Sequence, residues 1–371
     1  MKLFYVDNNA SHYRKAIYLL MDQSFDVDFL FGQSLNDIKQ MDTSVLRGNV
    51  EMTRSYQLLG NWYWQKGVFS KVWKKYDRYL LIGDSYSLST WFFSFFALLL
   101  GKRKRLFFWT HGWYGKESWL QRIVKKIYLR MPGGGVFLYG NYARNLMIEQ
   151  GFTPNKLFVI HNSLDHDHQL AIRQHLHLDD VYVKHFTNNN QNLLFVGRLT
   201  KVKKLDMVLL AMSHLKKKGQ RFNFTLIGDG EKKQELESLT NKLGLKDNVW
   251  FYGACYDEKS LGLLIYNADL CVSPGNVGLT AMHVMVFGTP VLTHNDFPYQ
   301  MPEFEAVHDG VTGAFFKRDD MESLSTSIVN WFDNNGNKRE LVRNACFNEI
   351  DTQWTPEFQI KVLKYNLENN I

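Results

Sequence analysis

The segment from residue 273 to residue 313 constrains the fold of this chain more than any other. An apolar run over residues 268–272 indicates a buried strand, and a loop containing Gly275 and Gly278 follows it. Apolar residues then recur at helical spacing, and residues 291–293 indicate a second strand. Together these elements predict a βαβ unit whose helix begins with free backbone amides. Such a helix end suits a phosphate, although two glycines also fit a simple turn.

Strands and helices alternate on both sides of this segment, and 371 residues are enough for two domains. Five early strands are expected at residues 2–6, 79–82, 106–109, 135–138 and 157–160, and later ones begin at Leu193, Phe224 and Val249. This order is typical of parallel sheets covered by helices, so the sequence predicts an α/β fold.

The segment after residue 273 resembles the donor-binding segment of GT-B glycosyltransferases, specifically the retaining family 4. Gly278-Leu279, Met285 and the run Gly288-Thr289-Pro290-Val291 carry the resemblance. Gly-Arg-Leu at residues 197–199 and Gly-Asp-Gly at residues 228–230 also match family motifs. The resemblance implies two Rossmann-like domains that face a cleft, with a C-terminal helix that crosses back to the first domain.

The resemblance also implies domain boundaries. Residues 1–165 would form an N-terminal acceptor-binding domain, 193–350 a nucleotide-sugar-binding domain, and 351–371 the helix that packs back on the first domain. Between the domains, residues 166–192 are polar and are expected to form a linker. Four of its histidines, His166, His168, His175 and His177, lie close together in the sequence, but no cysteine or carboxylate set at ligand spacing accompanies them, so no metal site is predicted.

The donor diphosphate is expected to bind at the start of the second domain. A guanidinium and an ammonium together neutralise a diphosphate leaving group, and the family register selects Arg198 and Lys203 for these roles. The alternative is a solvated, lysine-rich loop. The backbone of the donor loop would supply further contacts, from Asn276, Val277, Gly278 and Leu279.

Two glutamates of the family motif are missing here. The first falls on Gly275, and we expect Glu303 or Glu305 to compensate for it in catalysis. The second falls on His283, whose ring nitrogen can bind a ribose hydroxyl, although a surface helix histidine is the alternative. On the nucleotide side, Gly228 and Tyr256 complete the predicted contacts.

Acceptor binding is expected at loops of the first domain that follow strands. His111 follows the strand at residues 106–109 and is the catalytic candidate there, because a histidine can position a hydroxyl or share its proton. On residue type alone a structural role for His111 is favoured, and the resemblance reverses that order. Asn9, Tyr13 and Arg14 follow the first strand and are expected on the acceptor side.

Residues 62–131 contain 14 basic and 3 acidic residues, interleaved with tryptophan and tyrosine. This pattern suits an anionic membrane surface, with a solvated basic face and nucleic-acid binding as alternatives. The most apolar run, residues 91–100, is too short to span a bilayer and is expected to form a buried helix. Three scattered cysteines and the absence of a secretory signal favour the cytoplasm, with peripheral attachment to the inner face of the cell membrane.

The sequence therefore predicts a metal-independent, retaining glycosyltransferase without a cofactor. Its partners would be a nucleotide-sugar donor of unknown base, a lipid-linked or oligosaccharide acceptor from bacterial surface polysaccharide synthesis, and an anionic membrane, but not nucleic acid. The alternatives are an inverting GT-B transferase, a nucleotide-sugar epimerase, or a decayed transferase that only binds nucleotide or polysaccharide.

Overall fold

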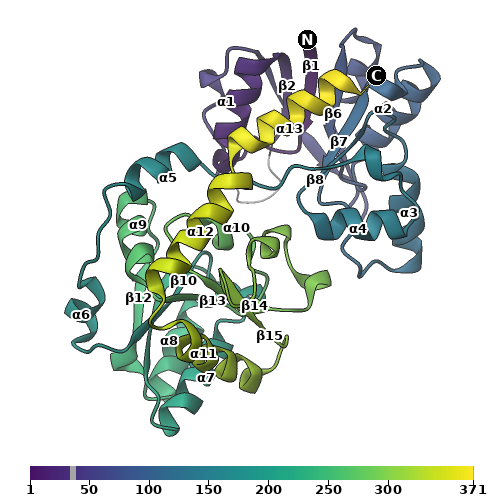
Figure 1. The fold of residues 1–371 in the computed structure, drawn as a ribbon. Coiled ribbons are helices and arrows are strands. Elements are labelled where there is room, and N and C mark those ends of the chain that lie inside the picture. Colours follow the sequence, from purple (N-terminus) through teal and green to yellow (C-terminus); the bar gives the residue numbers. More distant parts are fainter. Residues whose placement is uncertain (34–38, 371) are drawn as a thin grey trace. The chain divides into compact units, whose positions relative to one another are not determined.

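The computed structural model describes residues 1–33 and 39–370, which form two compact units (Figure 1). Unit 1 consists of Met1–Asp165 and Gln353–Ile371, and unit 2 of His166–Thr352. Each unit has its own parallel sheet with helices packed against it. This arrangement confirms the predicted α/β class with two Rossmann-like units.

The sheet of unit 1 has the strand order β3-β2-β1-β6-β7-β8-β9, and all its neighbouring strands are parallel. The strands are β1 (Lys2–Asp7), β2 (Asp26–Gly32), β3 (Asn49–Thr53), β6 (Arg78–Ile82), β7 (Leu106–Thr110), β8 (Gly135–Leu138) and β9 (Leu157–Val159). A short antiparallel pair, β4 (Ser55–Gln57) and β5 (Tyr63–Gln65), lies apart from it. All five predicted strands are present, but β2 and β3 were not predicted because acidic and polar residues interrupt their apolar pattern.

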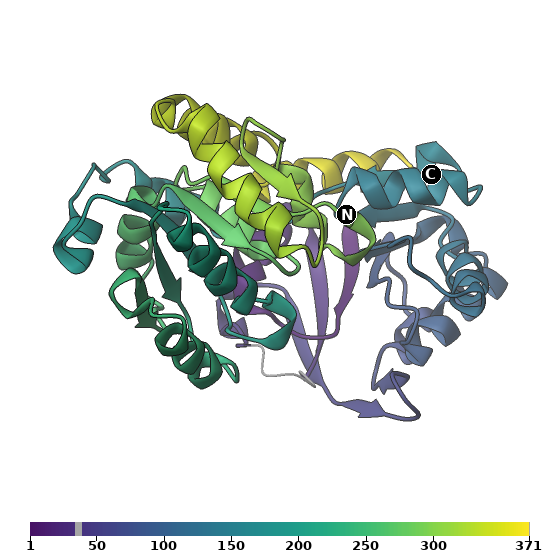
Figure 2. The same cartoon turned by 90° about the horizontal axis from the view of Figure 1, so that it is seen from below.

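Helices cover both faces of this sheet, and Figure 2 shows it from a second direction. On one face lie α1 (Lys15–Ser24) and α13 (Pro356–Asn369). Leu363 and Leu367 of α13 are fully buried in the core of unit 1. On the other face lie α2 (Leu88–Leu99), α3 (Trp119–Leu129) and α4 (Asn141–Glu149). The C-terminal helix thus packs on the first unit, as the fold class implies.

The expectation that residues 91–100 form a wholly buried helix is wrong. In α2, Phe93 and Ala97 are buried, whereas Phe95 is 48% and Leu99 63% exposed. A uniformly apolar run has no polar residues that mark its solvent side, so the sequence could not distinguish a half-exposed helix from a buried one. Within residues 1–33 and 39–370, no helix combines the length and apolarity that crossing a bilayer requires.

The sheet of unit 2 has the order β12-β11-β10-β13-β14-β15, also parallel throughout. Its strands are β10 (Gln191–Val196), β11 (Phe222–Ile227), β12 (Val249–Gly253), β13 (Leu270–Ser273), β14 (Val291–His294) and β15 (Gly313–Phe316). Its helices after the first strand are α7 (Asp206–Lys217), α8 (Lys233–Lys242), α9 (Glu258–Asn267), α10 (Leu279–Met285), α11 (Met321–Asn335) and α12 (Arg339–Gln353). The βαβ unit predicted from residues 268–293 is present as β13, α10 and β14.

The segment 166–192 is folded as part of unit 2. It contains α5 (His166–Arg173) and α6 (Val181–Phe186), both of which pack against α9. His166 is buried, and its Nε2 lies 2.8 Å from an Asp351 carboxylate oxygen. His168, His175 and His177 are exposed, as expected for them, and so is the fifth histidine of the segment, His185.

Candidate functional site

The carboxyl ends of β10, β11 and β12 meet at three glycines, Gly197, Gly228 and Gly253. The Gly228 amide donates to the Gly253 carbonyl over 2.8 Å, and the Gly197 amide donates to Ile227 over 2.9 Å. A Cβ atom on Gly228 would lie 1.9 Å from the Gly197 carbonyl oxygen. The close approach of these strand ends therefore requires glycine at 228, whatever binds beside it.

Arg198 follows directly after this edge and is exposed. Within the described parts of the chain, no hydrogen bond, ion pair or ring contact holds its guanidinium group. Most arginines of unit 2 differ: Arg318 and Arg339, for example, form ion pairs with Asp296 and Asp269. Arg198 is thus a guanidinium at the carboxyl edge that is available for an anionic ligand.

Lys203 lies at the end of η6 (Lys201–Lys203) and holds the donor loop. Its Nζ donates to the Asn276 carbonyl oxygen over 2.7 Å and to the Asn276 Oδ1 over 3.0 Å. Burial lowers the pKa of Lys203 to about 8, although the nearby Glu303 carboxylate acts in the opposite direction. The predicted phosphate-binding residues Lys203 and Asn276 therefore lie in direct contact.

Gly275 is packed against η6. Its amide donates to the Lys203 carbonyl over 3.1 Å, and an added Cβ would lie 1.9 Å from the Val202 carbonyl oxygen. A glutamate side chain cannot occupy this position unless the backbone of η6 moves. The absence of the family glutamate here is thus coupled to the way the lysine-bearing turn supports the loop.

Val277, two residues after Gly275, corrects a sequence-based prediction. Val277 is fully buried, and its amide donates to Gln300 Oε1 over 2.9 Å, so this amide is not available to a phosphate. The Gln300 Nε2 donates to Thr293 Oγ1 over 2.8 Å and to the His294 carbonyl over 2.9 Å. Gln300 thereby ties the donor loop to the end of β14, a role that no sequence motif indicated.

Gly278 and Leu279 form the junction between this loop and α10. Gly278 has φ +55° and ψ −150°, a conformation that favours glycine, and Leu279 is the first residue of α10. Nothing lies closer than 3.9 Å to the position of a Cβ on Gly278. Glycine at 278 is therefore required by the backbone conformation and not by crowding.

His283 is paired with an acid that sequence analysis did not single out. Its Nε2 lies 2.9 Å from Glu258 Oε1, which also accepts a hydrogen bond of 2.7 Å from Gln169 Nε2. Despite partial burial, the hydrogen bond from His283 contributes to a lowered pKa for Glu258, so this carboxylate is charged near neutral pH. A ribose hydroxyl near His283 would therefore meet an imidazole–carboxylate pair and not an isolated ring.

The remaining predicted residues of unit 2 lie in different environments. Glu303, in η9 (Pro302–Ala306), is 2% exposed and close enough to Lys203 to affect its pKa, whereas Glu305 is only half-buried. Tyr256 is 88% exposed and can move without cost to the core. Of the two acids, Glu303 is the one placed beside the donor loop.

Unit 1 contains a cavity of about 590 Å³ beyond the carboxyl end of β7. Its walls carry the aromatic rings of Trp62, Tyr86, Trp109, Tyr114 and Tyr139 and the polar groups of Asn8, Asp84, Lys116, Glu117 and Lys125. Aromatic side chains with a few convergent polar groups are typical of a pocket that binds a small molecule.

His111 lines this cavity, as predicted from its place after β7. Its ring centroid lies 4.7 Å from that of Tyr139 and 6.1 Å from that of Tyr114. Burial, and then the positive charges of Arg14 and Lys125, lower the pKa of His111 to about 4. At neutral pH the ring is therefore uncharged and can donate one hydrogen bond and accept another.

A buried ion pair fixes the loop that follows His111. Lys125 Nζ donates to Glu117 Oε1 and to the Gly112 carbonyl, each over 2.8 Å. Both oxygens of Glu117 also accept backbone amides, from Tyr114 and Gly115. Although burial alone would raise it, these contacts lower the pKa of Glu117, and they hold the loop rigidly against α3.

The expectation that Arg14 faces the acceptor is not met. Arg14 is 7% exposed, donates from Nη1 to Asp7 Oδ2 over 2.7 Å, and lies with its guanidinium carbon 4.3 Å from the Trp109 ring centroid. A buried acid at the end of β1 requires a cation, and Arg14 supplies it. Asn9 is also buried and bonded to its neighbours, whereas Tyr13 is half-buried.

The lowered pKa of Lys203 predicts a pH effect on donor binding. Above pH 8 the free protein loses the Lys203 charge, so affinity for a nucleoside diphosphate should fall roughly tenfold per pH unit until the pKa of the bound state is reached. The Lys203→Arg variant stays charged, and its affinity should be flat from pH 7 to 9.5 in titration calorimetry. Parallel profiles for both proteins would show that Lys203 does not contact the ligand.

The lowered pKa of Lys203 also makes the stability of the fold depend on pH, in the direction opposite to that of donor binding. Because the folded pKa lies below the unfolded one, the native state binds fewer protons between about pH 8 and 10.5. The Lys203 contribution therefore favours folding more as pH rises through this window. Binding and folding thus respond to the same proton in opposite directions.

Comparisons with known proteins agree with this arrangement. Residues 183–346, most of unit 2, match the family described as glycosyl transferases group 1. An uncharacterized glycosyltransferase of Methanocaldococcus jannaschii is 23% identical over 88% of this chain and 86% of its own length. An α-1,4-N-acetyl-D-galactosaminyltransferase of Campylobacter jejuni, whose name gives a saccharide linked to diphosphoundecaprenol, is 28% identical over 41% of this chain and 42% of its own length.

The fold agrees as well. The crystal structure of HepE from Anabaena in complex with UDP superposes with a TM-score of 0.73 at 16% identity, covering 99% of this chain and 100% of that one. The two parallel-sheet units thus correspond to a known two-unit fold. Residues 183–346 of unit 2 are similar to a group 1 glycosyltransferase domain, and the protein is a glycosyltransferase with the GT-B fold.

Proposed function

We propose that this enzyme transfers a sugar from a nucleoside-diphosphate sugar to a lipid-linked saccharide, with retention of the anomeric configuration. The observation that carries the proposal is the exposed Arg198, which has no partner within the described residues and lies near Lys203 at the carboxyl edge of unit 2. As the bond between the sugar C1 and the diphosphate oxygen breaks, negative charge grows on the leaving group. The two cations stabilise that charge.

Uridine diphosphate is the first donor class to test, because a structural relative was solved with UDP. Retention is proposed because the segment with Gly278 and Gly288 resembles retaining family 4, and because the Campylobacter relative is named for an α-linkage. Since Arg198 and Lys203 supply the positive charge, we propose that transfer needs no metal ion. Activity should then survive treatment with EDTA.

The acceptor is proposed to bind in the cavity of unit 1. The Trp62, Trp109 and Tyr139 rings offer faces for a sugar ring, and neutral His111 offers one donor and one acceptor to its hydroxyls. Exposed apolar residues on α3, Trp119, Ile123 and Ile127, lie on the helix that also lines the cavity. A lipid attached to the saccharide could therefore continue along α3, at a peripheral position on the inner membrane face.

The first experiment is a thermal-shift screen with UDP, GDP, dTDP, CMP and ADP, followed by transfer assays with sugars of the nucleotide that binds. A shift with one nucleoside diphosphate and a product of unchanged anomeric configuration by NMR are expected. An inverted product would replace retention with the inverting alternative. No shift with any of the five would contradict the proposed donor class.

Glu303 is proposed to take the place of the missing first glutamate beside the donor sugar. Glu303→Gln keeps the shape but removes the charge, so kcat should fall by about 10- to 100-fold while the fold is retained. Glu305→Gln, in the same turn but half-buried, is the matched control and should stay near full activity. Full activity of both variants would exclude compensation by either acid.

A further inference from the structure

A second cavity in unit 1, of about 640 Å³, lies away from the site described above. It is lined by residues at the starts of β8 and β9, Gly135 and Leu157, whereas the His111 cavity follows the carboxyl end of β7. The two cavities share no lining residue. The second cavity is therefore at the amino edge of the sheet, where donor and acceptor chemistry does not need it.

Four cations line this basic pocket: Arg103, Lys104, Arg130 and Lys156. No acidic residue is among its described lining residues, and none of the four cations forms an ion pair within the described parts of the chain. Other cations of unit 1 vary: Arg14, Lys71 and Lys125 are each paired with a carboxylate, whereas Lys74 and Lys75 form no ion pair within the described residues. Four unpaired cations around one hollow indicate an anionic ligand.

Backbone carbonyls hold the two guanidinium groups in place. Arg103 donates from Nη2 to the Arg130 carbonyl over 2.9 Å and from Nε to the Met131 carbonyl over 3.2 Å. Arg130 donates from Nη2 to the Gly151 carbonyl over 3.0 Å, and its guanidinium carbon lies 5.3 Å from the Phe152 ring centroid. These neutral contacts orient both forks without cancelling their charge, and a fixed guanidinium fork matches phosphate oxygens.

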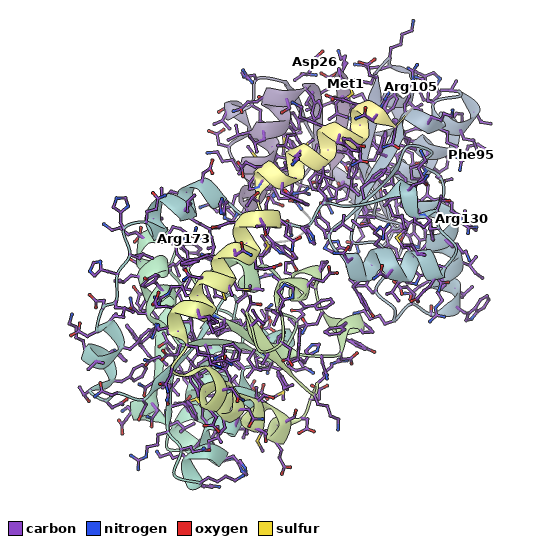
Figure 3. All side chains as sticks on the ribbon, in the orientation of Figure 1. Met1, Asp26, Phe95, Arg105, Arg130 and Arg173 are labelled. Carbon is purple, nitrogen blue, oxygen red and sulfur yellow. The ribbon has the colours of Figure 1, made fainter. Side chains whose placement is uncertain are left out.

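Exposed apolar residues precede two of the lining arginines, Arg103 and Arg130, in the sequence. Leu98, Leu99 and Leu100 at the end of α2 are 51%, 63% and 44% exposed, and Ile127 on the last turn of α3 is 55% exposed. The two helices are neighbours, since the Trp91 and Tyr128 ring centroids lie 4.8 Å apart. Figure 3 shows Phe95 and Arg130 at the periphery of unit 1.

We propose that this basic pocket binds the phosphate of an anionic phospholipid head group, with the acyl chains along the exposed ends of α2 and α3. A soluble phosphate would match the cations but would leave the apolar residues without a partner. The lipid accounts for both features, so it is the source to which the charge and the apolar surface point. The proposal deepens the membrane attachment contained in the proposed function and rests on it.

The test is flotation of the full protein with two kinds of vesicle. One kind is phosphatidylcholine alone, and the other also contains ~30 mol% phosphatidylglycerol, which gives a negative surface potential. Thr153 lines the pocket and is exposed, so Thr153→Trp fills the hollow without changing charge. Its neighbour Asn155 is exposed but does not line the pocket, so Asn155→Trp is the matched control. Thr153→Trp should weaken binding to the anionic vesicles about tenfold, and Asn155→Trp should not.

Charge variants provide a second, independent arm. Arg103→Gln with Arg130→Gln should weaken binding about 30-fold, as expected for two cations at an anionic surface. Lys74→Gln with Lys75→Gln removes two exposed charges of unit 1 outside the pocket and should weaken binding much less. Equal losses in the two double variants, or no loss in Thr153→Trp, would overturn the proposal in favour of a diffuse basic surface.

Two further outcomes separate the sources and the proposals. If inorganic phosphate stabilises the protein through Arg103 and Arg130 while the same variants float normally, the pocket is a soluble-phosphate site and the lipid proposal is wrong. If the wild type binds UDP but does not float with anionic vesicles, this inference fails while the proposed donor class stands. If it floats but binds no nucleotide, only the proposed donor class fails.

Discussion

Replacing Arg198 with alanine should lower kcat/KM for the nucleotide sugar by about 10²- to 10³-fold, as expected when one donor to a developing anion is removed. The effect is large because Arg198 has no role inside the described protein that would be lost at the same time. Thermal unfolding without ligand should therefore be unchanged. The stabilisation of wild type by the nucleoside diphosphate should be reduced or absent in the variant.

Two variants make this result specific. Arg198→Lys keeps the charge but not the fork and should recover part of the loss. Arg221→Ala removes an exposed arginine elsewhere in unit 2 and should have wild-type kinetics. An Arg198→Ala enzyme with unchanged KM and kcat would show that the diphosphate does not bind at this edge.

Replacing Gln300 with leucine should destabilise the protein by about 2–4 kcal/mol, because buried polar groups at Val277, Thr293 and His294 lose their partner. The donor loop is then no longer tied to the end of β14. Affinity for the nucleotide should fall together with stability. Urea unfolding and calorimetric titration with the diphosphate measure the two effects on the same sample.

Gln234→Leu is the control for this experiment, since Gln234 is exposed on α8 and should tolerate the change. Gln300→Glu separates the two ends of the clamp: its carboxylate still accepts from the Val277 amide but no longer donates to the His294 carbonyl. A Gln300→Leu protein with normal stability and normal nucleotide affinity would exclude the clamp.

The sequence predicted much of this fold because its strong signals are local. Buried parallel strands read as short apolar runs, and Gly197, Gly228, Gly278 and Gly288 mark the turns that follow or precede them. The strands β2 and β3 were not predicted, because Asp26, Asp28 and Glu51 interrupt their apolar pattern. Their place in the sheet is decided by neighbours far along the chain.

The site was harder to predict, because its contacts join distant segments. Gln300 reaches Val277 across 23 positions, and Glu258 meets His283 across 25. No spacing rule connects such pairs. Arg14 shows the reverse case: a charged residue in a polar loop reads as exposed, but the buried Asp7 at the end of β1 draws it into the core.

The contact between Gly275 and η6 couples the substitutions that these two segments can accept. The Val202 carbonyl oxygen lies 1.9 Å from the position of a Cβ on residue 275, so a glutamate introduced there alone would clash with the backbone. Position 275 could accept a glutamate only if the turn that carries Lys203 shifted, and that shift would also break the hydrogen bond from Lys203 to Asn276. Substitutions at the two segments are therefore not independent, and the order in which they occur decides which are tolerated.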